Sequence, residues 1–185
     1  LGWSLGGLVA LRLALDHPDR VQSVVTVATT PRFTAADDWP AAMKPDIFNA
    51  FEQMCREDYE GTLVRFLALN CKGPESMRQD VARLKEILYF CGLPAHRALR
   101  EGLAILRDTD LRRDLAALEV PLHMIFGARD NIVPAAAMAA VEPLLNERGD
   151  TALIEQVAHV PFLSAPDTFT RAVYDFYRRH QLIDG

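Results

Sequence analysis

A serine between two glycines opens the chain, in the segment Gly2-Trp3-Ser4-Leu5-Gly6, and an apolar stretch typical of a buried helix follows over residues 7–15. A sharp turn from a strand into a helix strains the backbone at its apex, which is tolerated only where the neighbouring residues are small. Such a turn would expose the Ser4 hydroxyl at the edge of a sheet. It would also leave the backbone N–H of Leu5 free at the helix N-terminus, able to donate to a developing oxyanion. The sequence therefore predicts a strand, a strained serine and a helix in direct succession.

Composition and charge limit the class of protein. Of the 185 residues, 50% are hydrophobic and the net charge is −5, which suits the core of one soluble domain and does not favour nucleic-acid binding. No apolar run approaches the roughly 18 residues that a membrane helix needs. The longest run is interrupted by Arg12 and ended by Asp16. We therefore expect a cytoplasmic monomer with no nucleic-acid or membrane partner.

The three cysteines, Cys55, Cys71 and Cys91, are odd in number and show no CxxC spacing. They predict buried free thiols rather than a disulfide framework. Cys71 and Cys91 do not follow an expected strand, so we interpret them as buried residues and not as nucleophiles. The sequence contains no HExxH motif, no cluster of Asp and His, and no phosphate-binding glycine loop. It therefore predicts neither a metal nor a cofactor.

The chain begins inside the serine motif and without a methionine. In parallel sheets of this kind, the serine turn normally follows several earlier strands. We therefore expect an upstream part of the same domain, without which one apolar side of the sheet would be unpaired.

Patterns typical of strands and helices alternate in the segments 1–33 and 111–185. The β-branched run Val21–Ala28 predicts a buried parallel strand. Further strands are expected at Pro121–Gly127 and Ala152–Glu155, and helices at Ala135–Leu145 and Thr168–Arg179. This alternation predicts a mostly parallel sheet with helices on both faces.

The segment 34–110 differs in character. Pro31 and the pair Trp39-Pro40 mark a loop, after which apolar residues recur at helical spacing over Ile47–Leu69, with a break expected at Gly61. Two more helices are expected, at Glu75–Tyr89 and Ala95–Leu106. We interpret residues 34–110 as a helical cap inserted between the two core segments.

A serine hydroxyl is a weak nucleophile until an imidazole takes its proton and a carboxylate orients that imidazole. After a serine turn of this kind, both partners lie in loops that follow later strands, the acid before the histidine. Asp130 follows the strand expected to end near Phe126, and His159 follows the next strand along the chain. The sequence therefore predicts a catalytic triad of Ser4, His159 and Asp130, with the N–H of Leu5 as an oxyanion donor.

Other acids and histidines compete for these roles. Taken alone, Asp130 would be interpreted equally well as a turn residue. Only its position relative to Ser4 and His159 favours its assignment as the acid of the triad. Asp108 and Asp110 lie at the end of the cap, and Asp150 is expected in a turn before a strand, so we interpret all three as solvated or capping residues. The remaining histidines are interpreted as structural or exposed: His17, His96, His123 and His180.

Five segments carry a resemblance to a known family: Gly2–Ala10, Val25–Ala28, Arg65–Leu69, Arg78–Asp80 and Ala158–Phe162. In them the sequence resembles the pimeloyl-[acyl-carrier protein] methyl ester esterases, a family of the α/β-hydrolase superfamily, and the resemblance spans essentially the whole chain. It implies the α/β-hydrolase fold, of which this chain would be the C-terminal portion. It also implies a cofactor-free serine carboxylesterase of biotin synthesis, which removes the methyl ester from a pimeloyl chain attached to its acyl-carrier protein.

The resemblance also assigns roles to residues of this sequence. Ser4, Asp130 and His159 match the family's triad, and Leu5 matches its backbone oxyanion donor. The residues implied to contact substrate are Trp3 and Phe66, and those implied to dock the carrier protein are Arg65, Arg78 and Arg83. Gly61 and Ala82 stand where the family can carry arginine. Independently, residues 61–100 hold seven Lys and Arg against three Asp and Glu, a local excess of positive charge that would suit an acidic carrier.

Two other kinds of function fit the same residues. One is a different reaction on the same triad, such as that of a general short-chain esterase, a carbon–carbon bond hydrolase or a cofactor-free perhydrolase. The other is a catalytically silent module that uses the cap to bind a carrier protein.

Overall fold

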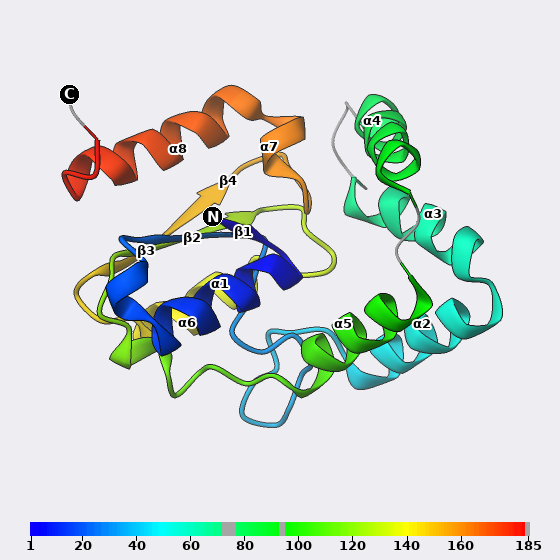
Figure 1. Cartoon of the computed structure of the whole chain (residues 1–185), viewed down its shortest axis with the longest axis horizontal. Coiled ribbons are helices and arrows are strands. Elements are labelled where there is room, and N and C mark those ends of the chain that lie inside the picture. Colours follow the sequence, from blue (N-terminus) through cyan, green and yellow to red (C-terminus); the bar gives the residue numbers. More distant parts are fainter. Residues whose placement is uncertain (72–76, 93–94, 184–185) are drawn as a thin grey trace.

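A computed structural model describes residues 1–71, 77–92 and 95–183, and within them four strands form one parallel sheet (Figure 1). The strands are β1 (Gly2–Trp3), β2 (Val24–Val27), β3 (Leu122–Gly127) and β4 (Gly149–Ile154), and their spatial order is β1-β2-β3-β4. Each strand pairs in parallel with the next. Parallel neighbours require crossover connections, and the helices of the chain supply them.

Helices cover both faces of the sheet, as Figure 1 shows. They are α1 (Leu5–Asp16) and α6 (Ala136–Val141) on one face, and α7 (Pro161–Ser164) and α8 (Pro166–Arg179) on the other. Successive side chains of β3 face opposite layers: Met124 and Phe126 join the core beneath α1 and α6, whereas Ile125 joins Phe176 of α8 in the second core. The expected α/β-hydrolase architecture, with helices on both faces of a parallel sheet, is confirmed.

The ends of several core elements differ from those expected. β2 is shorter than Val21–Ala28, and β4 starts at Gly149 rather than Ala152. The helix expected to reach Leu145 ends at Val141 and continues as a 3-10 turn over Glu142–Leu144. Pro143 explains this change, because proline has no N–H to continue the α-helical hydrogen bonds.

Four further helices gather beyond one end of the sheet (Figure 1). They are α2 (Pro45–Glu57), α3 (Tyr59–Asn70), α4 (Met77–Cys91) and α5 (His96–Asp108). We refer to them as the cap. The expected helix Glu75–Tyr89 corresponds to α4, and its first two residues lie outside the described part of the chain. The cap boundaries at residues 34 and 110 stay a prediction.

The break expected at Gly61 is wrong, because the chain breaks at Asp58 between α2 and α3. The Asp58 carboxylate caps α3 by accepting a hydrogen bond from the backbone N–H of Gly61 at 3.0 Å. A Cβ atom at Gly61 would lie only 2.1 Å from Oδ2 of Asp58. Gly61 therefore belongs to the first turn of α3, where it leaves room for the capping side chain.

The cysteine predictions are confirmed in two cases. Cys55 and Cys71 are buried free thiols, but Cys91 is exposed, so its expected burial is wrong. Cys91 ends α4, and the residue before it, Phe90, is 93% exposed. The last turn of α4 therefore faces solvent. Among the described residues, no helix combines the length and apolar character needed to cross a membrane.

Candidate active site

Ser4 joins β1 to α1 with φ 52° and ψ −121°, a conformation that L-residues rarely adopt. Its N–H donates to the carbonyl of Val27 in β2 at 2.8 Å. A Cβ atom on Gly2 would lie 2.2 Å from the carbonyl oxygen of Gly6, whereas one on Gly6 itself would meet no atom within 4 Å. The strained turn is therefore present as predicted, and of the two flanking glycines Gly2 is the one that sterics require.

Thr29, which the sequence analysis did not single out, supports this turn. Its side chain is buried, and the hydroxyl proton on Oγ1 is shared between two acceptors, the backbone carbonyls of Ser4 at 2.9 Å and Val27 at 3.1 Å. A Cβ atom on Gly7 would lie 2.1 Å from the same Oγ1. The first turn of α1 therefore packs directly on Thr29. A threonine just after the end of a buried strand, beside a serine turn, is the sequence signal that could have identified it.

Asp130 and His159 form a buried pair. The Nδ1 atom of His159 lies 2.7 Å from Oδ2 of Asp130, and the two side chains are 1% and 0% exposed. The other carboxylate oxygen accepts the backbone N–H groups of Ile132 at 2.7 Å and Val133 at 3.0 Å. These bonds fix the plane of the carboxylate. With Asp130 as acceptor, Nδ1 of His159 carries the proton and Nε2 holds the lone pair that a general base needs.

Trp3 connects this pair to the serine turn. Its indole N–H donates to the backbone carbonyl of His159 at 2.7 Å, and the two rings lie 5.6 Å apart between centroids. Since Ser4 follows Trp3 directly, the imidazole lies beside the serine turn. The Nε2 atom of His159 is buried and has no hydrogen-bond partner within the described residues, Ser4 included. The structure thus brings the predicted triad to one edge of the sheet without closing the bond between Ser4 and His159.

Leu5 is the first residue of α1. Backbone N–H groups in a first turn have no acceptor within the helix, and the helix dipole makes this end favourable for negative charge. The Leu5 side chain meets the cap, because its Cδ2 lies 3.1 Å from where a Cβ on Gly102 of α5 would stand. The predicted oxyanion donor therefore lies where core and cap touch.

The predicted substrate residues occupy different surroundings. Trp3 packs against the rings of His159 and Phe162. Phe66 lies on α3, and its ring centroid is 5.1 Å from that of Phe51 on α2. Contact between substrate and Trp3 or Phe66 stays a prediction.

The predicted docking arginines are exposed on two cap helices. Arg65 lies on α3 and pairs with Asp58 at 3.0 Å, with 61% of its side chain exposed. Arg78 and Arg83 lie exposed on α4. Their contact with a carrier protein also stays a prediction.

The competing acids have other partners. The expectation that Asp150 lies in a turn is wrong: it lies within β4 and bonds both Nδ1 of His123 and Arg179. Although burial opposes the shift, the hydrogen bond from His123 and the charge of Arg179 hold the pKa of Asp150 below its ordinary value. Hydrogen bonds, mainly from Arg112, lower the pKa of Asp110 to about 2. These acids are engaged away from Ser4.

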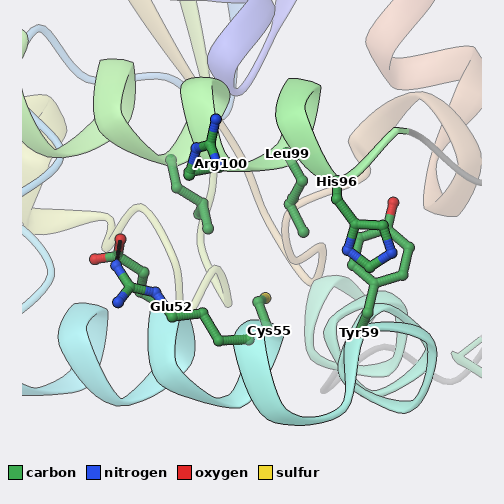
Figure 2. Close-up of a pocket in the computed structure, with 8 residues that line it drawn as sticks. Glu52, Cys55, Tyr59, His96, Leu99 and Arg100 are labelled. Atoms are coloured by element: carbon green, nitrogen blue, oxygen red, sulfur yellow. Dashed lines mark hydrogen bonds and ion pairs between the residues drawn. The ribbon is translucent and has the colours of Figure 1, made fainter.

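A separate cavity of about 240 Å³ lies in the cap between α2 and α5 (Figure 2). Cys55 and Leu99 reach into it from opposite helices, and the rings of Tyr59 and His96, tilted by 33° with centroids 4.2 Å apart, close one end. The eight described residues that line it include neither Phe66 nor any member of the predicted triad. Among the described residues, no group of three His, Cys, Asp or Glu is placed to hold a metal ion.

Comparison with known proteins identifies relatives across nearly the whole chain. The family model for the α/β-hydrolase fold matches residues 1–166. The pimeloyl-[acyl-carrier protein] methyl ester esterase of Pectobacterium carotovorum is 45% identical over 179 residues, covering 95% of this chain and 68% of that protein. The proteins of the same name from Klebsiella pneumoniae and Photorhabdus laumondii are 44% and 42% identical, over 91% and 98% of this chain and 65% and 69% of their own lengths.

Solved structures share the fold at lower sequence identity. An esterase from Exiguobacterium antarcticum has a TM-score of 0.80 at 23% identity, over 96% of this chain and 65% of its own. A bromoperoxidase from Bacillus anthracis has a TM-score of 0.79 at 20% identity, over 96% and 66%. At these identities the likeness concerns the fold alone.

Proposed function

Because the chain belongs to the pimeloyl-[acyl-carrier protein] methyl ester esterase family of α/β hydrolases, we propose that it hydrolyses the methyl ester of pimeloyl-[acyl-carrier protein] in biotin synthesis. The single observation that carries this reaction is the buried pair of Asp130 and His159 beside the strained Ser4, with Nε2 of His159 left without a protein partner. An ester carbonyl that reaches Ser4 would meet a nucleophile, a base and a helix N-terminus in one place.

In the proposed reaction, Nε2 of His159 takes the proton of Ser4 as its oxygen attacks the ester carbonyl. The backbone N–H of Leu5 stabilises the oxyanion. His159 then gives this proton to the departing methoxide, which leaves as methanol. A water molecule, deprotonated by the same nitrogen, attacks the acyl-enzyme, and His159 returns the proton to the Ser4 oxygen as the free carboxylate leaves. Asp130 holds the imidazole and stabilises its charged form. These steps use only side chains, backbone and water, so we propose a cofactor-free enzyme.

The substrate's carrier protein would dock on the cap. The whole chain carries a net charge of −5, yet residues 61–100 hold seven basic and three acidic residues. Arg65, Arg78 and Arg83 are exposed within this segment, and a local basic surface would attract an acidic carrier.

All three cysteines are free thiols, which is consistent with a reducing compartment. We therefore propose a monomeric enzyme that acts in the cytoplasm.

The test compares two substrates. The purified protein should hydrolyse methyl pimeloyl-carrier protein with a higher kcat/KM than a free short-chain ester such as p-nitrophenyl butyrate. Replacement of Ser4 by alanine should abolish both activities, together with labelling by a fluorophosphonate. Equal or higher kcat/KM for the free ester would overturn the assignment of the carrier-bound substrate. Undiminished hydrolysis by the Ser4→Ala variant would overturn the assigned nucleophile.

A further inference from the structure

The segment that carries His159 is held from the cap as well as from the sheet. The backbone N–H of His159 donates to the carbonyl of Asn70, the last residue of α3, at 3.0 Å. The hydroxyl of Ser164, the last residue of α7, donates to Oδ2 of Asp80 on α4 at 2.7 Å. Two cap helices therefore bond to this segment, one at each of its ends.

Apolar packing fills the space between these two bonds. Val160, which follows His159, lies in one buried cluster with Cys71 and Leu84. Cys71 comes directly after Asn70, and Leu84 lies one helical turn after Asp80. The parts of the cap that accept the hydrogen bonds thus also place apolar side chains beside them, and a hydrogen bond shielded from water is stronger. Figure 1 shows α7 at the end of the core that faces the cap.

Asp80 differs from its neighbours on α4. Its exposed fraction is 6%, whereas Arg78, Gln79 and Arg83 are exposed. A buried carboxylate is costly unless hydrogen bonds satisfy it, so an apolar residue would fill this place at lower cost. A buried acid bonded to the helix that follows His159 indicates that the position of that helix matters.

We propose that Asp80 is a positioning residue, which holds α7 through Ser164 and so keeps His159 in place beside Asp130. Since Arg78 and Arg83 lie on the same helix as Asp80, a carrier docked on α4 would act on the catalytic base through this bond. This effect of carrier docking on His159 rests on the proposed function. It requires the carrier to bind one arrangement of α4 more tightly than another.

Three variants test the positioning role: Asp80→Ala, Asp80→Asn and Ser164→Ala. With p-nitrophenyl butyrate, Asp80→Ala and Ser164→Ala should each lower kcat about tenfold, since small misplacements of catalytic groups are expensive, and KM should stay within about twofold. The Asp80→Ala/Ser164→Ala double variant should be no slower than either single variant, because both substitutions remove the same hydrogen bond, the one between Ser164 and Asp80. Asp80→Asn keeps an oxygen acceptor and should restore most of kcat. The rate of fluorophosphonate labelling should follow kcat.

Glu86→Ala is the matched control, because Glu86 is an exposed carboxylate on the same helix, and it should leave kcat unchanged. If Asp80→Ala does not fold, Asp80→Asn and Ser164→Ala carry the test. A Ser164→Ala variant with kcat within about twofold of wild type would overturn the positioning role, whatever its melting temperature. So would an Asp80→Asn variant as slow as Ser164→Ala.

The coupling to carrier docking is tested by repeating the series with methyl pimeloyl-carrier protein. The Ser164→Ala variant should lose roughly threefold more activity on this substrate than on the free ester, the size expected for coupling through a contact network. Equal losses on both substrates would overturn the coupling and leave the positioning role intact. Failure of the wild-type protein to use the carrier-bound substrate would overturn the proposed function instead, because the free-ester measurements do not depend on it.

Discussion

His159 and His123 are both buried, and each meets an aspartate through Nδ1: Asp130 in the first pair and Asp150 in the second. In both imidazoles Nε2 is buried without a hydrogen-bond partner among the residues described. By residue type, separation in the chain and burial of the histidine, the two pairs are nearly alike. They differ in where the sheet places them and in what else the acid contacts.

The first pair lies at the carboxyl end of the sheet, where ligands of open α/β sheets bind. There Trp3 ties His159 to the strained serine turn, and both oxygens of Asp130 are committed, one to the imidazole and one to backbone N–H groups. The second pair lies near the start of β3 and β4. Its imidazole stacks on Phe176, with centroids 5.1 Å apart. Since contact between a histidine and an aspartate does not distinguish the two pairs, their position along the strands is what favours a catalytic role for the first pair and a structural role for the second.

The largest difference between the two pairs is expected in kcat when their histidines are replaced. His159→Ala should lower kcat by a factor on the order of 10⁶, the scale seen when a triad base is removed. His123→Ala should keep kcat within about threefold of wild type, because no predicted catalytic group contacts it. Steady-state kinetics on a methyl ester measure both. A large loss in His123→Ala with an intact fold would show that the second pair takes part in the reaction.

Replacing the two acids should give a smaller contrast. Asp130→Asn removes the charge that orients His159 and stabilises its protonated form, so kcat should fall by about 10⁴. Asp150→Asn keeps the shape of the side chain and should change kcat by less than about twofold. Activity in Asp130→Asn close to wild type would mean that His159 does not depend on this carboxylate.

The second pair should instead contribute to stability. His123→Ala removes a buried ring stacked on Phe176 and its hydrogen bond to Asp150, so the free energy of unfolding should fall by about 2–4 kcal/mol. Urea denaturation followed by circular dichroism measures this. An unchanged denaturation midpoint would contradict the structural role of the pair.

The smallest expected effect is on the acid side of the stability profile. The folded-state pKa of Asp150 is lowered from 3.8, so its contribution to stability is present above about pH 4 and is lost as the pH falls through the folded pKa. Asp150→Asn should therefore flatten the decline of stability below about pH 4 and leave the profile between pH 5 and 7 parallel to that of wild type. Melting temperatures of both proteins measured across this pH range test the direction of this effect on stability. A decline below pH 4 as steep as that of wild type would contradict it.

The sequence sufficed to predict that Asp130 and His159 lie together beside Ser4, because the signals for this arrangement are local. The glycine spacing around Ser4 and the positions of Asp130 and His159 after successive strands each follow from a short segment and a rule about parallel sheets. The partners of Asp150 could not be predicted in the same way. They come from β3 and α8, far apart in the chain, and their contact depends on how strands register and helices pack.

Other differences have the same origin. Thr29 reaches Ser4 only because β2 lies beside β1, and the bond between Ser164 and Asp80 exists only because the cap folds back on the core. The break before α3 is set locally by two residues. The capping carboxylate of Asp58 defines the start of the helix, and Gly61 leaves room for that carboxylate. Glycine alone was too weak a signal to locate that boundary.

The contact of Trp3 with His159 gives this protein a fluorescent reporter beside the proposed catalytic base. The chain has two tryptophans, and the other, Trp39, lies beneath the Arg112 guanidinium. An indole's emission responds to its surroundings, so in a Trp39→Phe background the fluorescence of Trp3 should report directly on changes at His159. Changes around the imidazole could then be followed in the resting protein, without any turnover.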